Sequence, residues 1–507
     1  MKTAVVIGAG PAGLTAAYEL VRLSRDWRVI MLEETSDIGG ISRTARCGDC
    51  RIDIGGHRFF SKSQEVNALW RELMPPQGAP AKDDLLLGRA CRLDPGGPDP
   101  ERDERVMLHR RRVSRIYYLR HFFDYPITLK PATFLAMGLA RTWKASWSYL
   151  RSALVKRPEK SLEDFYINRF GRVLYSMFFE DYTEKLWGVH PSNISPEWGA
   201  QRVKGLSLWK AVLNIFLPKG GKRETSLIDS FLYPKRGPGQ LWEVLAGELR
   251  QRGVDIRLNA KATRVDVVGR NVVAVVTESG TRIPCDAVFS SMPIKDLVAS
   301  FAAPPPDVAQ IAAALPYRDF ITVGLLVDRL AIGNTTSIPT VNGIVPDTWI
   351  YVQERDVRLG RIQVFNNWSP YMVDDIARHV WIGLEYFCTE GDRLWTMDDS
   401  AFTAMAIREL QHIGVLAPHA VIHKSVRLKV KKAYPAYFGS YAQFEKVRAW
   451  LDGFSNLYCI GRNGQHRYNN MDHSMLCGME AARALVSGKG REKIWQVNTE
   501  EEYHESR

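Results

Sequence analysis

Three glycines near the start of the chain have the spacing of a phosphate-binding turn. Gly8, Gly10 and Gly13 form the pattern Gly-x-Gly-x-x-Gly, which follows a short apolar run and precedes a stretch with helical spacing. The first glycine permits a tight bend, the second lets a pyrophosphate approach, and the third lets helix and strand pack closely. The start of the helix then offers free N–H groups to the phosphates. In this context the pattern predicts a dinucleotide site rather than an empty glycine-rich loop.

An acidic residue ends the next predicted strand. Residues 27–33 form this second apolar run, and Glu33 stands 20 residues after Gly13. A carboxylate there can accept hydrogen bonds from ribose hydroxyls and would repel a 2′-phosphate, which argues against NADP. Glu34 is the competing candidate, but strand geometry favours the residue at the strand end.

A second glycine pair distinguishes FAD from NAD. Gly39 and Gly40 follow six residues after Glu33, and Ser42 and Arg43 come next. This pair is not needed to bind NAD, and the arrangement resembles flavoproteins of the amine oxidase and protoporphyrinogen oxidase type. The resemblance implies FAD, with the glycine pair near its flavin end and the arginine close to the cofactor. Because no second Gly-x-Gly-x-x-Gly is present, NAD(P)H is expected only as an external reductant.

Four further segments narrow the resemblance. They contain Gly55-Gly56-His57-Arg58-Phe59-Phe60, Phe123-Asp124-Tyr125-Pro126-Ile127, Tyr182-Thr183-Glu184-Lys185-Leu186-Trp187-Gly188, and Gly461-Arg462 with Arg467-Tyr468-Asn469-Asn470-Met471. Their order and rough spacing are similar to those of UDP-galactopyranose mutases, whereas residues 300–450 do not match convincingly.

This resemblance implies a reaction and a set of site residues. In that family reduced FAD uses N5 as a nucleophile on a nucleotide-linked sugar, and the sugar interconverts between pyranose and furanose. Carried over by position, the catalytic candidates are His57, Tyr182, Trp187 and Tyr468. Gly56, His57, Gly461, Arg462 and Met471 would join the glycines, Glu33, Ser42 and Arg43 in binding FAD.

The diphosphate clamp of that family is not clearly matched. Its two arginines are suited to bidentate contact with phosphate oxygens. One position falls near Arg202 and Lys204, and the other falls near Trp349, with Arg361 downstream. We take these four as substrate-binding candidates. The alternative function is an FAD-dependent oxidase or dehydrogenase of the amine oxidase and protoporphyrinogen oxidase type.

Several of these residues also have a simpler interpretation. A lone histidine among aromatic residues, such as His57, is more often a satisfied core residue than a functional one. Tyr182 and Trp187 are as readily explained by core packing when the resemblance is set aside. The glycines before His57 favour a close approach to a ring and hence a place beside the flavin.

The element pattern predicts an α/β fold. We expect a Rossmann-like FAD-binding domain of the glutathione-reductase type, formed discontinuously by residues 1–75, 225–300 and 450–490. Residues 106–224 should form a mostly helical insertion, and residues 301–449 a second, substrate-side sheet. The Pro-, Gly- and Asp-rich stretch 74–105 is expected to be a surface loop.

Composition and charge limit the remaining possibilities. The 507 residues are 45% hydrophobic and carry a net charge of +12, which suits an anionic ligand, a membrane surface or nucleic acid. No nucleic-acid motif accompanies the charge. The seven scattered cysteines indicate reduced thiols and no metal site, because Cys47 and Cys50 lack the second pair of a zinc ribbon.

Targeting signals, apolar runs and basic stretches of the sequence indicate where the protein is located. No signal peptide or membrane-spanning run is evident, so we expect a cytoplasmic enzyme with a small-molecule substrate, namely a nucleotide sugar. The basic, tryptophan-rich stretch 141–157 is either a solvated face or a peripheral membrane contact.

Overall fold

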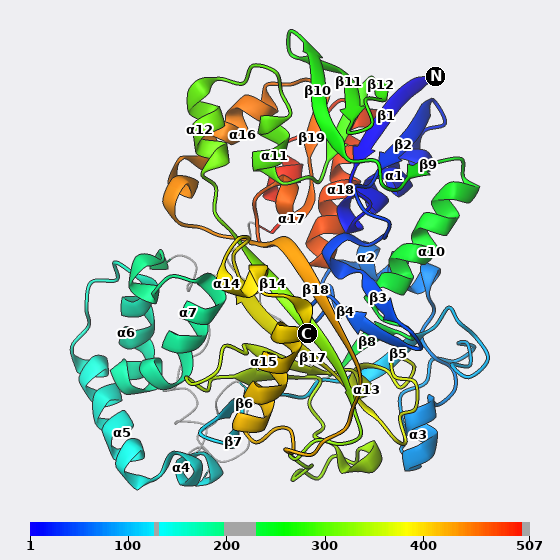
Figure 1. The fold of residues 1–507 in the computed structure, drawn as a ribbon. Helices are drawn as coiled ribbons and strands as arrows, with labels where there is room; N and C mark the ends of the chain where they lie inside the picture. The colour runs from blue at the N-terminus through cyan, green and yellow to red at the C-terminus, as the bar shows by residue number, and fades with distance from the viewer. Residues whose placement is uncertain (126–130, 197–229, 499–507) are drawn as a thin grey trace, which may run out of the picture.

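The computed structural model describes residues 1–125, 131–196 and 230–498. Figure 1 shows a parallel sheet with its helices in the upper part, a large, mainly antiparallel sheet below it, and a helical lobe to one side. The N-terminus lies in the upper part, where the blue, green and red segments of the chain come together. Segments far apart in the sequence therefore build the same layer.

The first sheet is parallel and has the strand order β19-β13-β1-β2-β9. Successive side chains of each strand point to opposite faces of the sheet, so they pack alternately into two hydrophobic cores. Ala4 and Val6 pack with α1 and α18, whereas Val5 and Ile7 pack towards the other face. The strands are β1 (Lys2–Ile7), β2 (Trp27–Leu32), β9 (Asp255–Arg257), β13 (Ala287–Ser290) and β19 (Leu457–Cys459).

Helices and a small sheet cover the two faces of this layer. One face carries α1 (Pro11–Leu23), α2 (Gln64–Leu73), α10 (Pro238–Gln251) and α18 (Met471–Ser487). The other face carries the antiparallel strands β10 (Ala262–Val268), β11 (Asn271–Thr277) and β12 (Arg282–Pro284) with α11 (Ile294–Ala299), α12 (Pro306–Ala313) and α16 (Phe444–Asp452).

The second sheet has seven strands in the order β18-β14-β17-β16-β15-β6-β7. All neighbours are antiparallel except β15 and β6. Its strands are β6 (Ser114–Tyr118), β7 (His121–Asp124), β14 (Tyr317–Val327), β15 (Trp349–Val352), β16 (Arg361–Val364), β17 (Val380–Cys388) and β18 (Ile422–Pro435). Helix α15 (Asp399–His412) packs on it through Phe402, Ala406 and Leu410, and α13 (Phe365–Trp368) and α14 (Arg393–Thr396) are short.

In the part of the helical lobe that the structure describes, there are four helices and a π-helical turn. These are α4 (Pro131–Met137), α5 (Leu139–Leu154), α6 (Leu162–Tyr175), the turn Ser176–Glu180 and α7 (Asp181–Trp187). The hairpin β6–β7, which precedes the lobe in sequence, joins the second sheet. The lobe is therefore anchored to that sheet and to the hydrophobic cluster around Phe123 and Phe178.

Two antiparallel strand pairs and several short helices make up the rest of the described fold. The pairs are β3 (Thr44–Cys47) with β4 (Cys50–Asp53), and β5 (Met107–Arg111) with β8 (Ser230–Pro234); the helices are α3 (Lys82–Leu87), α17 (Gly461–Gly464) and α19 (Lys493–Gln496). Cys47 and Cys50 are register partners across the first hairpin and are both free thiols. Among the described residues, no helix is long and apolar enough to cross a membrane.

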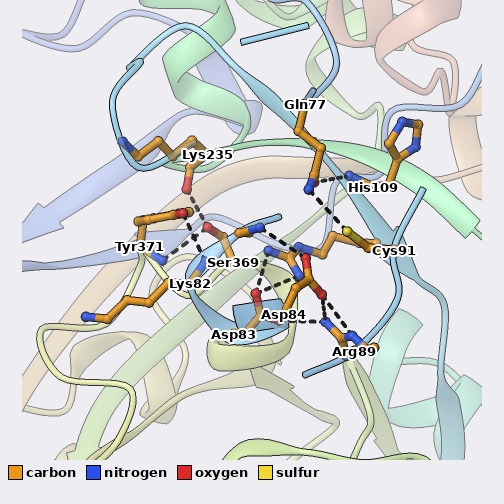
Figure 2. Close-up of polar contacts among 12 residues, drawn as sticks. Gln77, Lys82, Asp83, Asp84, Arg89, Cys91, His109, Lys235, Ser369 and Tyr371 are labelled. Atoms are coloured by element: carbon orange, nitrogen blue, oxygen red, sulfur yellow. Dashed lines mark hydrogen bonds and ion pairs between the residues drawn. The ribbon is translucent and has the colours of Figure 1, made fainter. Parts of the chain in front are cut away.

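The stretch 74–105 corrects one expectation, because it is not simply a surface loop. It contains α3, and Asp83 and Asp84 of that helix are buried. Figure 2 shows both aspartates directed at Arg89, and Asp83 also pairs with the buried Arg110 at 2.8 Å. A helix of six residues is too short to show periodicity in the sequence, and these ion pairs hold it in place.

Candidate flavin and substrate site

The carboxyl ends of the central parallel strands meet at one edge of the first sheet. Gly8 follows β1, Glu33 follows β2, Ser290 ends β13, and Gly461 comes two residues after β19. In open α/β sheets this edge is where ligands bind. The glycine turn, the predicted ribose acceptor and the C-terminal segment therefore converge, although 453 residues separate Gly8 from Gly461.

The first glycine turn has the close approaches that its sequence predicts. Gly8 has a φ of +98°, and a Cβ on Gly13 would lie only 2.0 Å from the Gly8 carbonyl oxygen. Helix α1 begins at Pro11 without a side-chain cap, so its first N–H groups are left for a ligand. These features fit a bound pyrophosphate.

The second glycine pair lies against the first turn. The Gly39 N–H donates to the Ala9 carbonyl at 2.9 Å, and a Cβ on Gly10 would lie 3.7 Å from the Gly40 Cα. Gly39 and Gly40 have φ values of +109° and +57°, which favour glycine at both positions. The two turns together form a backbone cradle without side chains, as FAD requires.

Ser42 and Arg43 stabilise the second turn from within. The Ser42 hydroxyl donates to the Gly39 carbonyl at 2.9 Å, and Arg43 Nη1 donates to the Gly40 carbonyl at 3.0 Å. Arg43 also lies 3.7 Å from Asp37, and burial lowers the pKa of its guanidinium. Both side chains thus fix the shape of the turn, and direct contact with FAD stays a prediction.

Glu33 is buried and holds the edge of the sheet together. Its Oε2 accepts the Ala9 N–H at 2.8 Å, and Oε1 accepts both the N–H and the hydroxyl of Thr35. A carboxylate oxygen can accept two hydrogen bonds, so Oε2 has capacity for one ribose hydroxyl. Glu34 is exposed to solvent, which fits the choice of Glu33.

The C-terminal segment covers the start of α1. Gly461 has a φ of +73°, and a Cβ there would lie 2.7 Å from the Ala12 Cβ. Met471 is buried and begins α18, which packs against α1 at Gly478, where a Cβ would meet the Ala12 carbonyl at 2.3 Å. This packing brings Arg462, on α17, to the cofactor edge of the sheet.

His57 is neutral and has a defined tautomer. Its Nε2 lies 3.0 Å from the Ile41 carbonyl and 2.9 Å from the Ile54 carbonyl, so Nε2 carries the proton and donates to both. Burial lowers the pKa of the imidazole to about 4, helped by the charges of Arg462 and Arg361. The ring therefore joins the second glycine turn to the end of β4, and Nδ1 is an acceptor.

Beside His57 lies a group of polar and aromatic residues that we call the tyrosine–arginine cluster. Arg361 Nη2 donates to the Tyr434 hydroxyl at 2.7 Å and lies 2.6 Å from the Glu385 carboxylate. Tyr434 stacks on Tyr468 at 5.9 Å, and the guanidinium of Arg462 lies 4.0 Å from the Tyr468 ring centre. The cluster consists of Tyr182, Tyr351, Arg361, Glu385, Tyr434, Arg462 and Tyr468.

The cluster draws on three parts of the fold. Arg361, Glu385 and Tyr434 come from β16, β17 and β18 of the second sheet. Tyr182 comes from α7 and packs edge-on against Tyr351 at 5.6 Å, and the charge of Arg361 acts on its hydroxyl. Arg462 and Tyr468 come from the C-terminal segment of the cofactor edge. The cluster therefore lies where the two sheets and the helical lobe meet.

Two buried hydrogen-bond donors without partners indicate which ligand the cluster suits. The Nε atoms of Arg361 and Arg462 are buried and have no hydrogen-bond partner among the described residues. Arg110 and Arg427 also have such an Nε, but each is held in an ion pair elsewhere in the fold. Burying a charged donor without a partner is costly, and those of Arg361 and Arg462 lie beside the cofactor edge, where a ligand acceptor would complete them. Both lie on guanidinium groups, which suit carboxylate or phosphate oxygens.

The remaining predicted residues have different surroundings. Trp349 packs against Gly56, whose Cβ would lie 2.7 Å from the indole, and Arg58 lies 4.7 Å from the centre of the Trp349 ring. Trp187 is buried in the apolar cluster with Phe165 and Ile54, as its core-packing interpretation expects. Arg202 and Lys204 lie outside the described residues.

Sequence reasoning missed three members of the cluster, namely Glu385, Tyr434 and Tyr351. Glu385 stands in the otherwise apolar strand β17 and is almost fully buried. A carboxylate in such a run is a signal that it pairs with a buried cation, because an isolated charge there would be too costly. Tyr434 and Tyr351 carried no comparable signal.

Comparison with known proteins identifies the family. The model of the flavin containing amine oxidoreductase family matches residues 11–486. A Mycobacterium tuberculosis protein described as a flavin-containing monoamine oxidase, AofH, is 25% identical over 322 residues, which are 62% of each chain. The chain thus spans less than two thirds of that relative. Coproporphyrinogen III oxidase of Mycobacterium bovis is 39% identical over 69 residues, covering 13% of this chain and 15% of that one.

Solved structures show the same fold. Reduced UDP-galactopyranose mutase superposes with a TM-score of 0.77 at 21% identity, covering 98% of this chain and 99% of the other. An Exiguobacterium sp. 255-15 protein described as a protoporphyrinogen oxidase gives 0.65 at 16% identity, with 96% and 98% covered. Putrescine oxidase with bound putrescine gives 0.57 at 14% identity, with 96% and 99% covered.

These matches confirm the expected α/β flavoprotein fold and FAD as the cofactor, and they agree with the backbone cradle formed by the two glycine turns. The family match also identifies the chain as a flavin enzyme. The chain belongs to the flavin-containing amine oxidoreductase family.

Proposed function

We propose that this enzyme is an FAD-dependent sugar-ring mutase that interconverts the pyranose and furanose forms of a nucleotide-linked sugar in the cytoplasm. The observation that carries the proposal is the pair of arginines Arg361 and Arg462, each of which has a buried Nε without a hydrogen-bond partner among the described residues, beside the tyrosines of the cluster. The fold shared with UDP-galactopyranose mutase supports the same assignment.

The charge of the cluster favours an anionic substrate over an amine. Arg361 and Arg462 contribute two positive charges, Glu385 contributes one negative charge, and His57 is neutral. The ring of Tyr468, which could attract an ammonium group, already has the Arg462 guanidinium 4.0 Å from its centre. A protonated amine would therefore meet net repulsion, whereas a diphosphate would be attracted.

FAD would be held by the two glycine turns, the free N–H groups of α1, Glu33 and the segment at Gly461 and Arg462. When bound in its reduced form, FAD supplies a nucleophilic N5 for a redox-neutral rearrangement of the sugar. The chain's own contribution is to hold both the cofactor and the substrate and to keep charged groups in place around them.

The tyrosines of the cluster would act as hydrogen-bond donors to the sugar nucleotide. Burial raises the pKa of Tyr182 well above its usual value and that of Tyr434 to about 12, so both hydroxyls stay protonated. The Tyr434 oxygen accepts from Arg361, which leaves its own O–H to donate to the substrate. Arg361 Nε would complete its hydrogen bonds on a phosphate oxygen.

His57 would position the flavin side of the site rather than transfer a proton. Its Nε2 proton is committed to two backbone carbonyls, and its low pKa keeps the ring neutral. A neutral ring beside the glycine turn leaves the local charge to the two arginines. We therefore assign it a positioning role.

The alternative is an FAD-dependent oxidase or dehydrogenase. The amine oxidoreductase family model and the similarity to AofH favour it. The carboxylate of Glu385 is the group in the cluster that could pair with an amine, although Arg361 already lies 2.6 Å from it.

The experiment is a chromatographic and mass-spectrometric assay of UDP- and TDP-linked sugars with dithionite-reduced holoprotein. The proposal predicts an isomer of equal mass, no net consumption of reductant, and loss of activity in R361Q. The matched control is R358Q, because Arg358 is exposed to solvent three residues before. Steady peroxide formation coupled to oxidation of the substrate would reject the mutase in favour of the oxidase.

A further inference from the structure

Helix α5 of the lobe is fixed by its inner face. Ala145 is buried, and the Ser148 hydroxyl accepts the Val173 N–H from α6 at 3.2 Å. At Gly171 the two backbones approach so closely that a Cβ would lie 2.8 Å from the Ser148 carbonyl carbon. These contacts fix the orientation of α5, so the face opposite Ala145 points to the solvent.

That opposite face is a continuous apolar surface, which we call the outer stripe. At 3.6 residues per turn its members fall within about 80° of arc, on the side away from Ala145. The outer stripe consists of Leu139 (88% exposed), Trp143 (73%), Trp147 (65%), Leu150 (51%) and Leu154 (84%). Leu135 on α4 is 81% exposed and lies one turn before it in sequence. Soluble monomers rarely expose an apolar patch of this kind without a partner.

The charged residues on the segment that carries the outer stripe are all basic. Residues 131–158 contain no Asp or Glu but five basic residues, all of them exposed, namely Arg141, Lys144, Arg151, Lys156 and Arg157. Tryptophan and leucine on one face, with lysine and arginine beside them, are the composition of a helix that lies in the headgroup layer of a membrane. Long basic side chains can reach anionic headgroups while their stems cover apolar surface.

The position and length of α5 suit a surface contact. Figure 1 places α4 and α5 at the outer end of the helical lobe, away from the parallel sheet. Sixteen residues extend about 24 Å along the helix axis. The stripe runs along the exposed side of α5, so a lipid layer can contact it along its length. A second copy of the chain would bring two basic ridges together, and like charges across such an interface repel.

We propose that the outer stripe of α5 docks the enzyme onto an anionic lipid bilayer surface. The tryptophans and leucines enter the headgroup region, and the neighbouring basic residues pair with anionic headgroups. This docking surface is independent of the reaction proposed above, because none of its residues belongs to the tyrosine–arginine cluster.

The test measures binding of the FAD-loaded protein to phosphatidylcholine vesicles with and without phosphatidylglycerol, by flotation and by tryptophan emission. We expect binding only with the anionic lipid, release by salt, and a blue shift of the emission. W143S/W147S should bind at least about a hundredfold more weakly, from the apolar area lost. K144Q/R151Q should lose about fivefold per charge.

The matched control is L85S/L86S on α3, where both leucines are more than half exposed outside the stripe. We expect this variant to bind like the wild type, and flavin absorbance checks that every variant is folded. Failure to bind anionic vesicles would overturn the proposal, as would equal binding by W143S/W147S. A W143S/W147S variant that changes only the oligomeric state would assign the stripe to a protein interface and would also overturn it.

Discussion

The buried pair of Arg361 and Glu385 makes an asymmetric prediction about stability. The Glu385 side chain is 1% exposed, whereas that of Arg361 is 17% exposed. R361Q therefore leaves a carboxylate without its cation in a site that water hardly reaches, at a cost of about 3–5 kcal/mol. E385Q leaves a guanidinium that retains some contact with water, and the new amide keeps a polar partner for Gln363, so the cost is about 1–3 kcal/mol.

These costs convert into modest shifts of the melting temperature. An unfolding entropy of about 2.1 cal/mol/K per residue gives roughly 1 kcal/mol/K for a chain of this length. R361Q should then melt about 3–5 °C below the wild type, and E385Q about 1–3 °C below it. The double variant R361Q/E385Q carries neither charge of this pair and should melt above R361Q, because the two effects are not additive.

The assay is thermal unfolding of the FAD-loaded proteins, followed by flavin fluorescence at one fixed concentration of free FAD. Holding FAD constant matters because bound ligand raises the melting temperature by mass action. R358Q serves as the control for removal of an exposed arginine from the same stretch. Equal melting temperatures for R361Q and E385Q, or a double variant less stable than R361Q, would refute the reasoning from burial.

Three further predictions concern the cofactor site and pH. G13A should lose FAD in purified protein, because its Cβ would clash with the backbone. The control G247A should retain FAD, since nothing lies within 4 Å of the added Cβ. Flavin absorbance per protein measures the FAD content of both variants. E33A should bind FAD at least about tenfold more weakly by titration, and E34A should bind normally, because only the first carboxylate is buried at the sheet edge. Burial lowers the pKa of His466 to about 4, so the stability that its neutral ring contributes should be complete above pH 6.5 and be lost as the pH falls towards 4. The melting temperature should therefore depend less on pH in H466Q than in the wild type.

The cofactor half of the site could be predicted from local sequence. The glycine spacing and Glu33 follow from the requirements of one strand–turn–helix–strand unit, so the order of residues along the chain specifies them. Gly461 and Arg462 were found only by resemblance, since their place beside α1 depends on packing between residues more than 400 positions apart.

The substrate half could be predicted only in part. Arg361 was one of several arginines in its stretch, and its contact with Tyr434 depends on the pairing of β16, β17, β14 and β18. Glu385 and Tyr434 had no local motif because their role arises from strand order. Helix α3 was missed for a related reason, as its stability comes from ion pairs with Arg89 and Arg110 rather than from an apolar period.

The most direct test of an anionic substrate beside FAD is a difference-absorbance titration of the flavin in the holoprotein. UDP and benzylamine are added separately under anaerobic conditions to wild type and to R361Q. The account predicts a saturable flavin perturbation by UDP that R361Q weakens at least about tenfold, and no reduction of the flavin by benzylamine. Bleaching of the flavin by benzylamine, with no response to UDP, would contradict it.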